Sequence, residues 1–214
     1  MTPENSSRYG KFGLRNLPYI CGVASPLVAY VGILLATILT PGFTWTSSSL
    51  SWLGSPAGQY NYLFNYSIIA GALIGLPFAA VLFLDSRGKA KRFASVLLFI
   101  ALVGLLGVGV FHLDVNTEIH SLSALVFFIA ATFALYIWGS AKVLEDRKEW
   151  GLFTIWLGIL HVLGWVIYSV QELVLGSTAI QGIAIPESWG AALFGLWVIA
   201  VARKRLGYDP LYFD

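Results

Sequence analysis

The chain has 214 residues, of which 57% are hydrophobic and only 11% are charged. Soluble domains carry about 25% charged residues, so this composition excludes a soluble globular domain and indicates a protein of the lipid bilayer. The single cysteine, Cys21, excludes an intrachain disulfide and a zinc site built from cysteines.

Six apolar stretches are long enough to cross the hydrocarbon core of a bilayer, which needs about 20 helical residues. They are continuously apolar and do not alternate between apolar and polar residues, which predicts helices and excludes barrel strands. The fold class is therefore predicted to be all-α, a polytopic integral membrane protein built as a six-transmembrane-helix bundle. The predicted spans are Pro18–Thr40, Tyr60–Leu84, Phe93–Leu113, Ile119–Leu144, Trp150–Leu175 and Ile185–Ala202.

The positions of the basic residues predict how the bundle is oriented. All 13 Lys and Arg residues fall before the first span, between the second and third, at the turn between the fourth and fifth (where Lys142 lies in the last turn of the fourth) or after the sixth. Such an excess marks the cytoplasmic side, so both the N-terminus and the C-terminus are predicted to be cytoplasmic in a multi-pass protein of the cell membrane. The chain then divides into a cytoplasmic segment (1–17), a transmembrane domain (18–202) and a cytoplasmic tail (203–214).

The longest predicted loop, residues 41–59, lies on the outer side and carries no charge. Its serine, threonine, glycine and tryptophan content predicts a re-entrant loop or a short helix that caps the bundle. The serine run within it is interpreted as an ordinary polar loop. In the spans that follow, Gly71 with Gly75 and Gly104 with Gly107 predict close contacts between helices, because small residues let helix backbones approach in lipid.

Polar and ionisable side chains gather at the predicted outer ends of the helices. Isolated ionisable groups facing lipid are costly, so we expect these side chains to converge in an outward-facing polar cavity. They are Asn61, Asn65, His112, Asp114, His120, Glu172 and Glu187, and Glu118 at the same level fits a helix cap.

The fifth span carries one polar face on an otherwise apolar helix. Its members follow helical spacing: His161, Trp165, Tyr168, Ser169 and Glu172. This face is predicted to line a path from the outer surface to His161 near mid-bilayer. The alternative interpretation makes His161 a hydrogen-bonded core histidine.

Histidine together with carboxylate suits a divalent metal such as zinc. His112, Asp114 and His120 are the candidate ligands, on condition that the third span ends near His112 so that the chain can fold back. A bound water would then attack an ester or amide, with Glu172 and Asp114 as the catalytic candidates. The alternative interpretation is that these residues are helix caps in the headgroup zone. A haem held by two histidines is a further hypothesis.

Short motifs of the chain resemble a prokaryotic membrane family of unknown function, the domain-of-unknown-function 998 group. They are S-W-L-G at Ser51–Gly54, Y-L-F-N-Y-S-I-I-A-G at Tyr62–Gly71, G-V-F-H-L-D at Gly109–Asp114, I-H at Ile119–His120 and F-F at Phe127–Phe128. The family has an acidic residue within its S-D-L-G motif, where this chain has Trp52. The resemblance implies a six-helix membrane fold and no established activity.

The chain is also distantly similar to the alkaline ceramidase and adiponectin-receptor-like superfamily, whose members are intramembrane zinc hydrolases. Their final-helix H-x-x-x-H pair is absent, and they have seven helices, so no residue role is transferred.

Two functions stay open from the sequence. The first is a membrane accessory protein, or a protein that binds lipid or a protein partner within the membrane. The second is a metal-dependent hydrolase of a lipid-like ester or amide, with a haem-binding electron-transfer subunit as a further alternative. No basic amphipathic surface indicates nucleic acid, and the chain lacks a Walker loop.

Overall fold

The structure is a computed structural model that describes residues 13–175 and 182–207. Within these ranges it has seven α-helices, one 3-10 turn at Leu14–Asn16 and no strand. The α-helices are α1 (Leu17–Leu39), α2 (Leu50–Leu53), α3 (Asn61–Asp85), α4 (Lys89–Val110), α5 (Thr117–Leu144), α6 (Lys148–Leu175) and α7 (Ala184–Arg205). Residues 1–12 and 208–214 of the predicted terminal segments lie outside the described residues.

Every helix except α2 is long and apolar enough to cross a membrane, which confirms the all-α architecture with six spans. Three helices extend further into charged sequence than predicted. Helices α4 and α6 begin at Lys89 and Lys148, and α7 continues to Arg205. Long basic side chains reach water from the last turn of a span, so the backbone there stays helical and keeps its hydrogen bonds.

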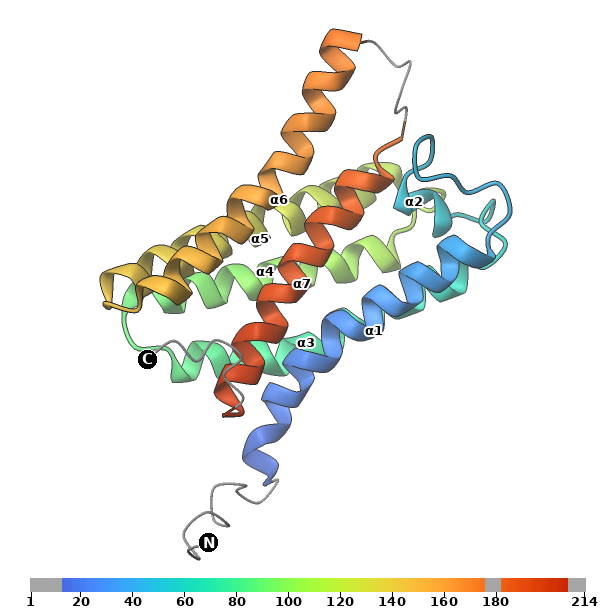
Figure 1. Cartoon of the computed structure of the whole chain (residues 1–214). Coiled ribbons are helices and arrows are strands. Elements are labelled where there is room, and N and C mark those ends of the chain that lie inside the picture. The colour runs from blue at the N-terminus through green and yellow to red at the C-terminus, as the bar shows by residue number, and fades with distance from the viewer. Residues whose placement is uncertain (1–12, 176–181, 208–214) are drawn as a thin grey trace, which may run out of the picture.

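The helices run back and forth between two ends of the bundle (Figure 1). We call one the basic end: it comprises the α3–α4 turn, the α5–α6 turn and the last turn of α7. We call the other the α2 end, where α2 lies near the start of α7 and the α4–α5 turn. Helix α7 packs against α1, α5 and α6. Figure 1 shows the second half of α6 leaning away from the remaining helices toward the α2 end.

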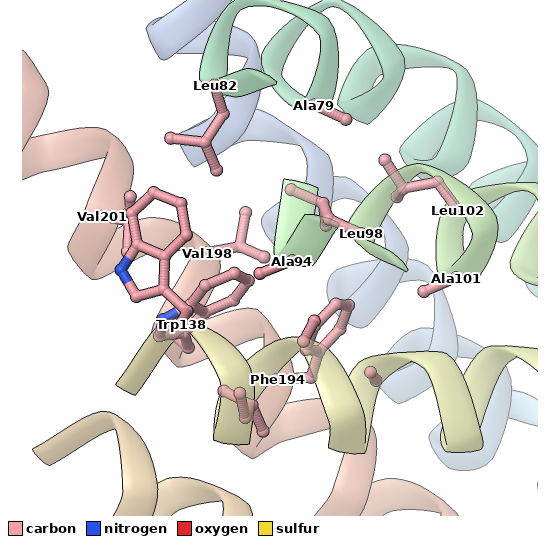
Figure 2. Packing of buried hydrophobic residues seen from close by; sticks show 14 of the residues in the cluster. Ala79, Leu82, Ala94, Leu98, Ala101, Leu102, Trp138, Phe194, Val198 and Val201 are labelled. Carbon is pink, nitrogen blue, oxygen red and sulfur yellow. The ribbon is translucent and has the colours of Figure 1, made fainter. Parts of the chain in front are cut away.

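Buried side chains from all six spans fill the core nearer the basic end, part of which Figure 2 shows. Leu82 of α3, Leu98 of α4, Trp138 of α5 and Val201 of α7 belong to this cluster of buried residues. Since lipid tails are as apolar as leucine, such a core is held by close packing more than by exclusion of water.

Glycines bring helix backbones together, as the sequence predicts. A Cβ added to Gly104 would lie 2.8 Å from the backbone nitrogen of Phe127 in α5. One added to Gly71 would lie 2.7 Å from the Cβ of Ala29 in α1. Both distances are too short for real side-chain contacts, so only glycine allows these two helix pairs to approach as they do.

Candidate functional site

The loop between α1 and α3 folds over the α2 end and is fixed to the start of α7. The backbone amide of Gly182 donates to the Thr46 carbonyl at 2.9 Å, and that of Ala184 donates to the Ser48 carbonyl at 3.0 Å. Helix α2 then begins at Leu50, where the Ser49 hydroxyl caps it by accepting from the Trp52 amide. Of the two predicted forms of this loop, the structure contains the short helix.

Glu187, in the first turn of α7, points its carboxylate at α2. Its Oε2 accepts a hydrogen bond from the Leu50 amide at 2.6 Å, and its Oε1 lies 3.5 Å from the Ser51 hydroxyl. The side chain is buried, and no ion pair among the described residues includes it. Hydrogen bonds therefore provide the polar partners of a buried acid.

His120, in the first turn of α5, contacts the same serine. Its Nε2 lies 2.8 Å from Ser51 Oγ, and its Nδ1 lies 2.9 Å from the Phe111 carbonyl oxygen. A carbonyl can only accept, so Nδ1 carries a proton. In the neutral imidazole, Nε2 is then the acceptor for the Ser51 hydroxyl. The ring is 3% exposed, so both hydrogen bonds are sheltered from water.

Ser51 is the link between a base and an acid that come from different spans. A hydroxyl has one proton, which goes either to His120 or to Glu187. When His120 is neutral, Ser51 donates to its Nε2. When His120 gains a proton, Nε2 donates to Ser51, which can turn its own proton toward Glu187. We call Ser51, His120 and Glu187 the polar triad.

The polar triad borders a cavity of about 460 Å³ between α5, α6 and α7. Most of its lining is apolar, with Leu125, Phe128 and Ile129 of α5 facing Val162 of α6. Leu125 and Ile129 are also exposed on the outside of the bundle. The cavity therefore borders the lipid-facing side of α5 and extends inward to the polar triad.

Two further side chains that line this cavity, His161 and Trp165, have buried polar atoms without partners. His161 is almost fully buried, and neither ring nitrogen has a hydrogen-bond partner of acceptable geometry in the described part of the chain. The backbone of Gly190 lies close to this ring without providing one. The indole nitrogen of Trp165 is likewise buried and unpartnered. Unpaired buried donors and acceptors are costly, so they mark a place where a polar ligand atom would be stabilised.

The structure does not bring the three predicted metal ligands together. Helix α4 ends at Val110, and His112 Nδ1 lies 4.0 Å from Asp114 Oδ2, so the chain does fold back there. His120, however, points to Ser51. Among the described residues, no three His, Cys, Asp or Glu side chains are placed to hold a metal ion. As a ligand of zinc or haem iron, His120 would have to give up a hydrogen bond.

The remaining predicted residues are distributed over several places. His161 and Glu187 line the cavity. Asn65 is buried elsewhere and donates through Nδ2 to the Gly54 carbonyl at 2.8 Å, which fixes the end of α2 to α3. Asn61 is the first residue of α3. Besides these two asparagines, the predicted residues that do not line the cavity are His112, Asp114, Glu118, Tyr168, Ser169 and Glu172.

Tyr168 and Glu172 lie one turn apart on the far part of α6, where their side chains interact. The polar face predicted for this helix is therefore divided: its first two members border the cavity, and its outer members contact each other.

Ser51 is the member of the site that reasoning from side-chain chemistry missed. A serine in an uncharged, serine-rich loop has no distinguishing local pattern. The available signal was its place at the start of the S-W-L-G motif, four residues that the family resemblance had already marked.

Comparison with known proteins shows the family of the chain. No curated protein and no solved structure matches the chain. A family model described as "Protein of unknown function (DUF998)" matches residues 23–204, which reach from the second turn of α1 to the last turn of α7. The chain is therefore an integral membrane protein of the DUF998 family.

Proposed function

We propose that this protein binds an amphipathic, lipid-like molecule in the cavity beside the polar triad. The observation that carries the proposal is the composition of the cavity: an apolar wall with the polar triad at one end and unpaired nitrogens on His161 and Trp165. Ligand sites are typically about 300–1,000 Å³, mostly apolar, with a few well-placed polar groups. At about 460 Å³ the cavity falls within that range.

The position of the cavity favours a ligand that arrives from the bilayer. Leu125 and Ile129 line it and are also exposed toward the lipid, so an acyl chain can reach the wall without crossing the α2 end. A hydroxyl, amide or ester group of the same molecule would meet the nitrogens of His161 and Trp165. Their unpaired state costs free energy until such a group binds.

A bulky substitution inside the cavity tests this proposal. We expect Val162→Trp to fill the space and to reduce labelling by a diazirine-bearing lysolipid at least several-fold. Ile159→Trp on the same helix is the matched control, because Ile159 is exposed and does not line the cavity. Labelled peptides from the unsubstituted protein should map to α5 and α6. Equal labelling of both variants, with equal thermal stability, would exclude the cavity as the binding site.

Ester hydrolysis is the second candidate function, and the Ser51–His120 contact favours it. A serine hydroxyl 2.8 Å from an imidazole, itself oriented by the Phe111 carbonyl, has the arrangement of a nucleophile and its general base. Ser51 Oγ would bond to the ester carbonyl carbon while its proton moves to His120. The ester C–O bond would then break, and His120 would protonate the departing alcohol. Water would then attack the acyl-serine while its proton moves to His120, and His120 would return that proton to Ser51 Oγ as the acid leaves.

A long-chain fluorophosphonate distinguishes hydrolysis from binding alone. For a hydrolase we expect covalent labelling that Ser51→Ala abolishes and Ser49→Ala retains. If the probe fails to label while lysolipid crosslinking persists, binding stands without hydrolysis.

Several predictions from the sequence have no further support in the structure and stay predictions. They are metal-dependent hydrolysis, haem binding, the similarity to the alkaline ceramidase superfamily, a protein partner in the membrane, the cytoplasmic location of both termini, and the cell membrane as the site of residence.

A further inference from the structure

The basic end of the bundle contains a second cavity, far from the polar triad, of about 700 Å³. Six basic side chains line it: Arg87, Lys91, Lys142, Arg147, Lys204 and Arg205. They come from the α3–α4 turn, α4, α5, the α5–α6 turn and α7. The spans thus bring together charges that are up to 118 residues apart in the sequence. We call this cavity the basic cleft.

The basic cleft holds more positive charge than its acids neutralise. Asp85 is the acidic residue in its lining, and its carboxylate accepts a hydrogen bond from Tyr19. Glu145 lies beside it and binds two of the three lysines, at 2.6 Å from Lys91 and 3.3 Å from Lys142. Six cations against two carboxylates leave an excess of four positive charges, which favours an anion.

A general preference for basic residues on one side of a membrane protein does not explain this arrangement. Such a preference is satisfied by side chains at the rim that extend into water. Lys91, by contrast, is only 6% exposed within the bundle. Lys89 and Arg203 lie at the same end and do not line the cleft, although they are exposed like the cleft residues Arg87, Arg147, Lys204 and Arg205. Some of the cations at this end therefore line the basic cleft while others do not, and one of those that line it is a buried lysine.

The aromatic residues of the cleft give it a fixed shape. Trp138 and Trp150 line it and are both buried. Trp138 belongs to the hydrophobic core shown in Figure 2, so the cleft lies directly on packed side chains. Lys204 Nζ lies 4.0 Å from the centre of the Trp150 ring, where a cation–π contact orients the lysine. A cleft with a rigid base and converging cations resembles a built ligand site more than a solvated rim.

We propose that the basic cleft binds a phosphate group carrying two or more negative charges. Arginine matches phosphate through paired N–H donors, and lysine adds compact positive charge. Basic pockets between transmembrane helices are a known setting for anionic lipid headgroups. The same chemistry would accept a soluble phosphate, so the experiment needs a lipid and a free ion as separate probes.

Binding to the purified full-length protein in neutral detergent tests this proposal. The probes are dioctanoyl phosphatidic acid and inorganic pyrophosphate, each titrated by calorimetry at low and high salt. Arg87→Gln with Arg147→Gln removes two cations from the turns that border the cleft. Lys89→Gln with Arg203→Gln is the control, because it removes equal charge from the same end outside the cleft.

We expect saturable one-to-one binding that the Arg87/Arg147 variant weakens about tenfold or more and the Lys89/Arg203 control changes less than about twofold, since charge-assisted hydrogen bonds to phosphate depend on direct contact. Binding of phosphatidic acid alone would identify a lipid headgroup, and equal binding of pyrophosphate would identify a soluble phosphate. Equal weakening in both variants, with unchanged melting temperatures, would overturn the proposal, as would the absence of saturable binding for both probes.

Discussion

The hydrogen bond between Glu187 and α2 gives the most direct test of how the α2 end is held together. Replacing Glu187 with alanine removes the acceptor of the Leu50 amide, a bond of 2.6 Å inside the protein. A buried donor left without an acceptor costs about 1–3 kcal/mol. We therefore expect Glu187→Ala to lower the free energy of unfolding by about that amount.

Two further variants make this prediction specific. Glu187→Gln keeps an oxygen that can accept from Leu50 and loses only the charge-assisted part, so we expect a cost of about 1 kcal/mol or less. Glu118→Gln removes an exposed acid at the same end of the bundle and should change stability by less than about 0.5 kcal/mol. Equilibrium unfolding in mixed micelles, followed by tryptophan fluorescence, measures all three. The reasoning would be refuted if alanine cost no more than glutamine.

Three other expectations concern packing, charge and topology. Gly104→Val should destabilise the protein by about 1–3 kcal/mol, because its side chain would meet the α5 backbone; a neutral result in thermal unfolding would contradict the close contact. Burial of Glu145 opposes its ionisation, but Lys91 and Lys142 outweigh burial and lower the pKa of its carboxyl. The ion pairs of Glu145 therefore stabilise the fold fully at pH values above the usual carboxyl pKa, and this stabilisation is lost as the pH falls through the lowered pKa. Glu145→Gln should flatten that acid limb, and an unchanged pH profile of the unfolding midpoint would exclude the linkage. Finally, in a background without the native cysteine, Thr46→Cys should react with an impermeant thiol reagent in intact cells and Lys89→Cys should not, whereas the reverse pattern would invert the predicted orientation.

The spans could be predicted because each depends on local composition alone. A run of apolar residues needs no distant partner to become a helix in lipid, since the helix satisfies its own backbone. The exact ends of the spans were harder to predict, because local composition does not distinguish a charged helical turn from a loop. Lys89 and Lys148 look like loop residues, yet their side chains can reach water from a helical turn.

The site could be predicted only in part, because its contacts join distant segments. His120 and Glu187 were identified as costly polar residues, and both border the cavity. Their shared partner, Ser51, lies 69 residues before one and 136 before the other. The metal hypothesis instead grouped His120 with residues that are neighbours in sequence. Side-chain direction at the ends of helices depends on how the helices pack, which helical periodicity does not determine.

The fixation of the first loop by α7 has a consequence for biosynthesis. The Leu50 amide is separated from its acceptor by 137 positions, and the Thr46 and Ser48 carbonyls are likewise paired with the segment that opens the last span. At the usual translation rates of about 5–20 residues per second, about 7–27 seconds pass between synthesis of the loop and of its partners in α7. During that interval α1 and α3 can already pack in the bilayer and Asn65 can bind the end of α2, while the 40–60 region lacks its contacts with α7. Emergence of α7 is then the step that completes the α2 end, and a ribosome stalled before residue 182 would leave this loop open to a protease.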